Sequence, residues 1–174
     1  MAKGAALTAL EPLLADTLAD TPGAEARLVQ AIAQHLRGES PAASGWETLR
    51  HTLDAVRHGA GGRPGHAATR ALLLATADAV REVLAEAIQA PAPHPDPARL
   101  PQTALDLAER GATEQLRHAH AVIATLASED AATANVARLR FYVGLDIDDI
   151  AVVLDMTSTT VRRAWNRVRT RLRS

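Results

Sequence analysis

The side chains of this chain that are best suited to chemistry are arginines near its C-terminal end. Six arginines and no acidic residue follow Met156. An arginine guanidinium is planar, always charged and weakly hydrated, and its forked donors match phosphate oxygens and the O6/N7 edge of guanine. Ser158, Thr159 and Asn166 lie in the same stretch and add smaller hydrogen-bonding groups. These residue types indicate contacts with nucleic acid.

A helix is needed to present these side chains on one face. Val161, Trp165, Val168 and Leu172 recur at spacings of four, three and four, so they form one apolar stripe. We predict a helix from about Ser158, capped by Thr157 or Ser158. The face away from the stripe then carries Arg162, Arg163, Asn166, Arg167, Arg169, Arg171 and Arg173.

A shorter helix is predicted just before it, from Asp146 to Leu154. Its first residues are carboxylates, which favour a helix N-terminus, and its apolar residues have helical spacing. Asp155 follows, and Asp is among the few non-glycine residues that tolerate the left-handed backbone of a sharp turn. Ala151 and Ala164 are small enough for the two helices to cross closely. The pattern predicts a helix-turn-helix, whose second helix enters the major groove of DNA.

The charge distribution supports this prediction. Residues 138–174 contain eight Arg and four Asp, a net charge of +4, and the rest of the chain holds eleven basic and sixteen acidic residues, a net charge of −5. An arginine run is more often only a solvated helix face. Here a basic segment follows an acidic body and a predicted helix and turn, and this combination favours DNA binding.

The same segment contains a longer motif. It begins with Leu139-Arg140-Phe141-Tyr142-Val143-Gly144-Leu145, continues with an acidic pair before Ile150-Ala151, and ends with Thr160-Val161, basic residues and Trp165. This motif resembles region four, the promoter-reading region, of extracytoplasmic-function (ECF) sigma factors. The family usually has glycine at the position of Asp155. Residues 48–57 and 70–84 echo, mainly by apolar spacing, the helices of the family's region two.

The resemblance implies two partners, double-stranded promoter DNA and core RNA polymerase, with an anti-sigma or other regulatory protein as a third. Region two in the family grips the polymerase and opens the promoter. For the helix-turn-helix we predict two sets of DNA contacts. Residues facing base edges are Ser158, Thr159, Arg162, Arg163 and Asn166. Residues meeting phosphates are Arg138, Arg140, Arg167 and Arg169.

Composition predicts an all-α fold, because Ala and Leu are abundant, aromatic residues are scarce and alternating β-branched runs are missing. Four prolines between residues 91 and 97 cannot sustain a helix and predict a linker. We therefore expect two small helical domains, at 1–90 and 102–174, joined by a Pro-rich linker at 91–101. The helices predicted in the first domain are Ala5–Ala19, Ala24–Arg37, Trp46–His58 and Ala67–Gln89.

The sequence argues against an enzyme and against a cofactor or metal site. It has no cysteine, no phosphate-binding glycine loop ending in Lys-Ser or Lys-Thr, and no His-Glu-x-x-His motif. His118 and His120 are two apart, so a helix would point them in different directions. No apolar stretch approaches the length needed to cross a bilayer, and no signal-like segment precedes the first helix. We expect a cytoplasmic protein without a membrane partner.

Two functions remain open. Promoter melting captures unstacked bases on aromatic or apolar side chains while basic groups hold the phosphates. Before residue 141 this chain has one aromatic residue, Trp46, and its helix near residues 71–90 is acidic. The chain is therefore either a sigma-like regulator that engages core polymerase, or a stand-alone repressor or activator. In the second case the acidic domain binds a partner protein or ligand and does not support melting.

Overall fold

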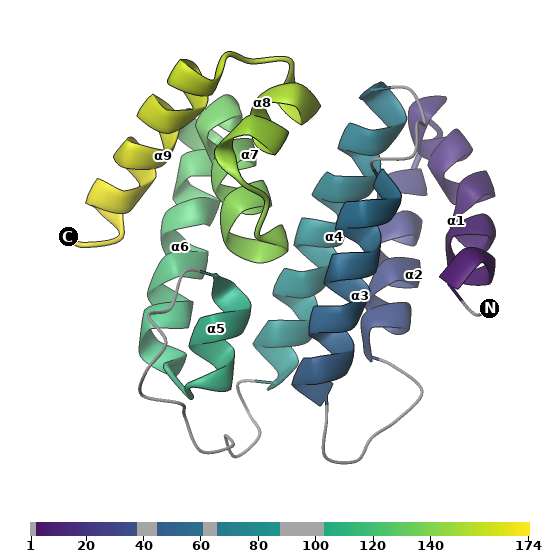
Figure 1. Cartoon of the computed structure of the whole chain (residues 1–174), viewed down its shortest axis with the longest axis horizontal. Helices are drawn as coiled ribbons and strands as arrows, with labels where there is room; N and C mark the ends of the chain where they lie inside the picture. Colours follow the sequence, from purple (N-terminus) through teal and green to yellow (C-terminus); the bar gives the residue numbers. More distant parts are fainter. Residues whose placement is uncertain (1–2, 38–44, 61–65, 88–102) are drawn as a thin grey trace. The chain divides into compact units, whose positions relative to one another are not determined.

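The computed structural model describes the backbone of residues 3–37, 45–60, 66–87 and 103–174. Every regular element in these ranges is a helix, so the predicted all-α class is confirmed (Figure 1). The chain divides into two compact units, Met1–Val83 (unit 1) and Leu84–Ser174 (unit 2). The linker predicted at 91–101 lies outside the described residues.

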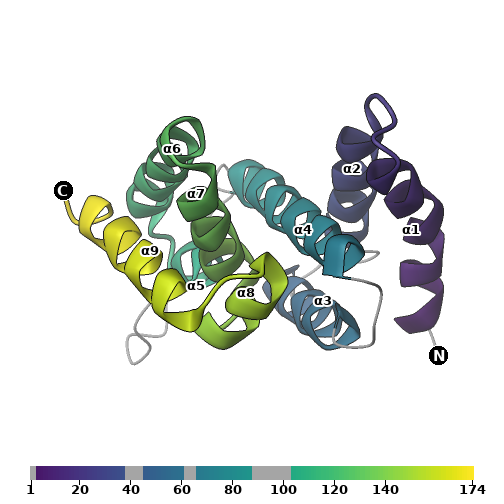
Figure 2. The ribbon, with the colours of Figure 1, turned by 90° about the horizontal axis from the view of Figure 1, so that it is seen from above.

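Unit 1 is built from helices whose predicted and observed ends agree within two residues. They are α1 (Lys3–Leu18), α2 (Ala24–Arg37), α3 (Gly45–Ala60) and α4 (His66–Ala87), the last of which runs on into unit 2. Helix α2 packs between α1 and α3, and α3 and α4 lie side by side (Figures 1 and 2). Apolar residues at helical spacing fill the core, including Leu28, Ile32, Leu49, Leu53, Leu73 and Val80.

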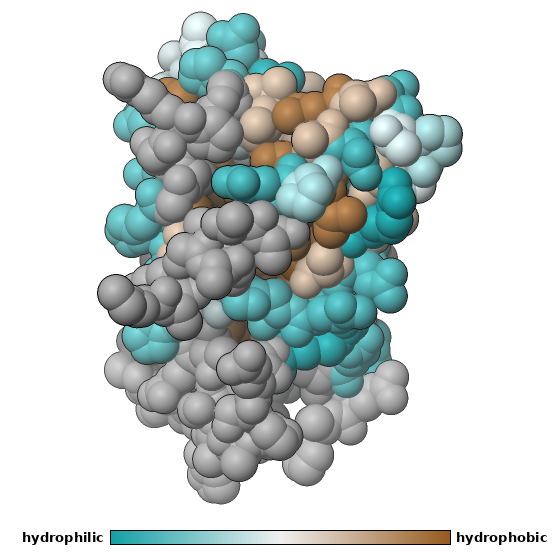
Figure 3. All heavy atoms as spheres, turned by 90° about the vertical axis from the view of Figure 1, so that its right-hand side faces the viewer, coloured by the Kyte–Doolittle hydropathy of each residue, from teal (hydrophilic) through white to brown (hydrophobic). Residues whose placement is uncertain are grey.

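The described side chains of α1 are those from Leu10 to Leu18. None of its side chains from Leu10 to Leu18 is fully buried, although four of them are leucines. Leu18 is 48% exposed. On this side of the molecule hydrophobic residues lie at the surface among hydrophilic ones (Figure 3). An apolar surface of this kind suits contact with another protein.

Unit 2 contains the predicted helix-turn-helix and the helices that support it. They are α5 (Ala104–Glu109), α6 (Thr113–Glu129), α7 (Ala131–Arg138), η1 (Leu139–Val143), α8 (Ile147–Leu154) and α9 (Ser158–Arg171). Helix α7 packs against both α6 and α9, and α8 packs against α9. The core is formed by large apolar side chains that are almost completely buried, among them Leu116, Leu126, Val136, Leu139, Ile150, Val161 and Val168.

The segment Leu139–Val143 forms a single turn of wide π-helix at the end of α7. Gly144 then takes a left-handed conformation, with φ of 79°, and ends the turn. Phe141 and Tyr142 are both buried and meet edge to face, with their ring centroids 5.3 Å apart. Tyr142 also stacks on His120 of α6, whose Nδ1 lies 2.7 Å from the tyrosine oxygen. The wide turn thus places two consecutive aromatic rings in the core.

The turn between α8 and α9 depends on the conformation of Asp155. This residue has φ of 53° and ψ of 51°, the left-handed conformation predicted from the sequence. Its backbone N–H donates back to α8, and the N–H of Met156 donates to the carbonyl of Ala151 over 2.9 Å. These bonds satisfy carbonyls at the end of α8. The turn therefore needs a residue that accepts positive φ.

We expect the stability of unit 2 to follow the left-handed preference of residue 155. Asp155→Ala should lower the free energy of unfolding by about 1 kcal/mol, because alanine tolerates positive φ less well than aspartate does. Asp155→Gly should be at least as stable as the natural chain, since glycine has no Cβ to strain. Urea unfolding followed by circular dichroism measures both. An alanine variant as stable as the glycine variant would contradict this account.

Candidate nucleic-acid interface

Local hydrogen bonds cap the first turn of both helices of the helix-turn-helix. The carboxylate of Asp146 accepts from the backbone N–H groups of Asp148 and Asp149 over 3.0 and 2.8 Å, and this caps α8. Thr157 caps α9 by accepting from the N–H of Thr160 over 3.2 Å. Between the helices the hydroxyl of Ser158 donates to Asp148 over 2.6 Å. The start of α9 is therefore held by its own cap and by α8.

The apolar stripe predicted for α9 is confirmed. Val161, Ala164 and Val168 are buried, and Trp165 and Leu172 are half-buried. Ala151 of α8 is also buried, and the two helices pack together. The opposite face of α9 is therefore turned to solvent on a helix that is fixed by packing.

The outward face of α9 carries five of the nine predicted DNA-binding side chains. They are Thr159, Arg162, Arg163, Asn166 and Arg169, and all are exposed. Across residues 103–174 and the other described ranges, none of these side chains makes an ion pair or a side-chain hydrogen bond. Their donors face water and remain free for a ligand. Ser158 is half-buried, and its hydroxyl proton is already given to Asp148.

One flank of α9 is held by acidic residues at the turn between α6 and α7. Arg167 lies 2.7 Å from the carboxylate of Asp130 and also reaches the hydroxyl of Thr133 at 3.4 Å. One helical turn further on, Arg171 lies 2.7 Å from Glu129. These two pairs link α9 to the turn between α6 and α7. Of the two arginines, Arg167 was predicted to meet phosphates, and here it also has an internal partner.

The other two predicted phosphate contacts lie outside α9. Arg138 ends α7, is half-buried, and donates to the side chain of Asn135 over 3.0 Å. Arg140 belongs to η1 and donates to the carbonyl of Leu145 over 2.6 Å, so its guanidinium has a fixed position. It lines the same cavity as Arg169.

Two carboxylates in this unit have shifted pKa values. The pKa of Asp130 is lowered from 3.8, mainly because the hydroxyl and the backbone N–H of Thr133 donate to it, and also because Arg167 is near. The pKa of Asp149 is raised from 3.8 by burial and by the neighbouring charges of Asp146 and Asp148. Asp130 is therefore stabilised as an anion, while the acidic start of α8 contains mutual repulsion that the helix N-terminus partly offsets.

Sequence reasoning missed Asp130 and Glu129, the acidic partners of the arginines. The signal for Asp130 was present, because Asp130-Ala-Ala-Thr133 before an alanine-rich run has the spacing of a helix cap. Nothing in the sequence linked Glu129 to Arg171, which is 42 positions away. Such a pairing requires the packing of α9 on α6 and α7.

Among the described residues neither a metal cluster nor a membrane span is present. Within the described ranges no group of three or more His, Cys, Asp and Glu residues could hold a metal ion. No helix in those ranges combines the length and the apolar character that a membrane span requires.

The lowered pKa of Asp130 leads to a prediction about stability and pH. A carboxylate with a depressed pKa stabilises the fold above its ordinary pKa, and this stabilisation is lost as the pH falls through the depressed value. Asp130→Asn keeps a capping side chain but removes the charge. We expect it to lower the free energy of unfolding at neutral pH by about 1 kcal/mol or less, because solvent screens the exposed pair.

The difference between natural chain and Asp130→Asn should then shrink as the pH falls below about 4. Asp130→Ala is the control, since it also removes the cap and should remain less stable than the natural chain at every pH. Denaturant unfolding at a series of pH values measures all three proteins. A difference for Asp130→Asn that does not depend on pH would show that the charge contributes nothing.

Comparison with known proteins agrees with the geometry of unit 2. A family model described as "ECF sigma factor" matches residues 29–174, which is most of the chain and includes all of the helix-turn-helix. No match was found among curated proteins or among solved structures.

Proposed function

The chain belongs to the ECF sigma factor family of transcription regulators, and we propose that it reads double-stranded promoter DNA through α9 while unit 1 engages core RNA polymerase. The observation that carries the proposal is the outward face of α9. The arginines on this face and Asn166 have no partner among the described residues. The helix that carries them is capped, packed by its apolar stripe, and ion-paired along one flank. Binding to DNA would then require little reorganisation of the protein.

The N-terminal half of α9 is proposed to read bases. In helix-turn-helix proteins the first residues of the second helix reach base edges in the major groove. Thr159, Arg162, Arg163 and Asn166 are the exposed side chains in this position. Arginine pairs with guanine through two hydrogen bonds, and asparagine pairs with adenine in the same way. Ser158 can still accept a hydrogen bond through its oxygen.

The phosphate contacts are proposed to come from the residues around this face. Arg169 is exposed and has no partner in the described chain. Arg138, Arg140 and Arg167 already donate to protein groups. A guanidinium has five N–H donors, so each of the three can keep its internal bond and still donate to a phosphate. Their internal bonds would orient them toward the backbone of the DNA.

A second candidate function is a stand-alone repressor or activator. Unit 1 has a single aromatic residue, Trp46, and so lacks the usual means of capturing unstacked bases. Its partly exposed leucines on α1 nevertheless offer a surface for another protein. That protein is core polymerase in the first proposal, and a different regulatory partner in the second.

We expect Arg162→Ala and Arg163→Ala to weaken binding to a preferred DNA site by about 1–3 kcal/mol each and to relax base preference at one position. Fluorescence anisotropy on a site selected from a random duplex pool measures the affinity. Arg117→Ala, which removes an exposed arginine of α6, is the matched control.

Affinity should also fall steeply with salt, because phosphate contacts release counterions. A flat salt response with unchanged Arg162 and Arg163 variants would refute DNA reading by α9.

Size-exclusion chromatography with core RNA polymerase distinguishes the two candidate functions. We expect the full-length chain to co-elute with core polymerase in a one-to-one complex at moderate salt, and a chain that lacks residues 1–90 to lose this association. Failure of the full-length chain to bind, with its DNA affinity intact, would favour the stand-alone regulator.

A further inference from the structure

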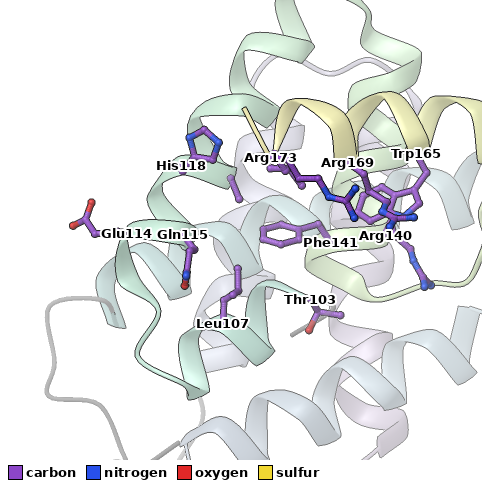
Figure 4. A pocket seen from close by; sticks show the side chains of 12 residues that line it. Thr103, Leu107, Glu114, Gln115, His118, Arg140, Phe141, Trp165, Arg169 and Arg173 are labelled. Atoms are coloured by element: carbon purple, nitrogen blue, oxygen red, sulfur yellow. The ribbon is translucent and has the colours of Figure 1, made fainter. Parts of the chain in front are cut away.

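Unit 2 contains a cavity of which the proposed function uses only two lining arginines, Arg140 and Arg169. Its volume is about 910 Å³, and it lies between α5, α6, η1 and α9 (Figure 4). Pockets for small molecules generally have volumes of about 300–1,000 Å³ and combine an apolar lining with a few polar groups. The size of this cavity therefore suits a small organic ligand.

One part of the lining is aromatic and apolar. It includes Phe141, Trp165, Leu107 and Leu172. Phe141 is only 5% exposed and is held edge to face against Tyr142. Trp165 is half-buried on the packed side of α9. Because Phe141 is almost completely buried, the half-buried ring of Trp165 is the main aromatic surface that a ligand can reach.

The rest of the lining is strongly basic. Arg140, Arg169 and Arg173 contribute three guanidinium groups, against one carboxylate, Glu114, which is paired with Arg117. Arg169 and Arg173 make no ion pair or side-chain hydrogen bond with any residue that the structure describes. Arg140 is oriented by its bond to the carbonyl of Leu145. The three like charges gain most from a ligand that carries negative charge.

We infer that this cavity binds a small anion with a flat aromatic body, of the nucleoside phosphate class, with its phosphates on Arg169 and Arg173 and its base against Trp165 and Phe141. Arginine forks match phosphate oxygens, and a nucleobase stacks on aromatic side chains. Gln115 also lines the cavity and can bond the base or the sugar.

The lining of the cavity favours a free nucleotide over duplex DNA. In a duplex the bases are stacked inside the helix, so a DNA backbone that passes the cavity offers phosphates and no free aromatic face. A free nucleotide offers both. The aromatic side chains of the cavity therefore gain contacts only with the small ligand.

A ligand in this cavity would also affect DNA binding, and this consequence rests on the proposed reading of DNA by α9. Arg169 lines the cavity and is also a proposed phosphate contact for DNA. A bound nucleotide would occupy its donors and neutralise its charge. Ligand and DNA then compete, and the ligand lowers the affinity of the protein for DNA.

Isothermal titration of the full-length protein with GDP and ADP tests the binding without DNA. Adenosine supplies the aromatic body alone, and inorganic pyrophosphate supplies the charge alone. We expect at least one nucleotide to bind with a Kd below about 1 mM, and both part-ligands to bind about tenfold more weakly or worse. No nucleotide binding in that range would overturn the inference. Equal binding of pyrophosphate would also overturn it, since the site would then be a simple anion site.

Substitutions of single residues test where the ligand binds. Arg169→Gln and Arg173→Gln should each weaken nucleotide binding about tenfold, whereas Arg163→Gln, on the same helix but outside the cavity, should leave it unchanged. The chain has two tryptophans, so Trp46→Phe leaves Trp165 as the single reporter, and its fluorescence should be quenched by the base. Equal losses in all three arginine variants, or no quenching, would refute the location. Tighter binding of a short single-stranded oligonucleotide with the same quenching would show that nucleic acid is the ligand instead.

Because these titrations contain no DNA, they are independent of the DNA-binding assays. DNA reading fails if the Arg162 and Arg163 variants bind DNA normally, whatever the nucleotide does. The regulatory consequence fails if a nucleotide binds the cavity and the affinity for DNA stays unchanged at saturating nucleotide.

Discussion

One carboxylate, that of Asp130, links α9 to the turn between α6 and α7. Its oxygens accept from the backbone N–H and the hydroxyl of Thr133, in the first turn of α7, and from the guanidinium of Arg167 on α9. Close packing of the buried stripe fixes α9 against its neighbours. The carboxylate adds directed bonds to that packing, because hydrogen bonds have a preferred geometry whereas the hydrophobic effect has none. The energy of such an exposed pair is small.

This arrangement divides the arginines of α9 into groups with different environments. Arg167 and Arg171 lie on the flank that faces acidic residues. Arg162 and Arg163 point to solvent, and Arg169 and Arg173 border a cavity with aromatic walls. In the sequence the six arginines look equivalent. Packing gives each pair its own electrostatic surroundings.

Features that depend on neighbouring residues could be predicted from the sequence. The apolar stripe of α9, the left-handed Asp155 and the cap at Thr157 all follow from spacings of four residues or fewer, and all are present. Features that depend on distant residues could not. The pairing of Arg167 with Asp130 joins positions 37 apart, and the cavity combines four helices. Periodicity identifies the buried face of a helix but not which partner will cover it.

Many contacts within unit 2 join residues that are close in the sequence, and this affects how the unit folds. Its helix caps join residues that are two or three apart, and most of its helices pack on the next helix or the one after it. Domains with such local contacts close only short loops before stabilising interactions form, and they generally fold within microseconds to milliseconds. The pairing of α9 with the α6–α7 turn is among the longest loops that unit 2 must close. The surface proposed to read DNA should therefore be among the last parts of the unit to form, and its acidic partners should act mainly on the rate of unfolding.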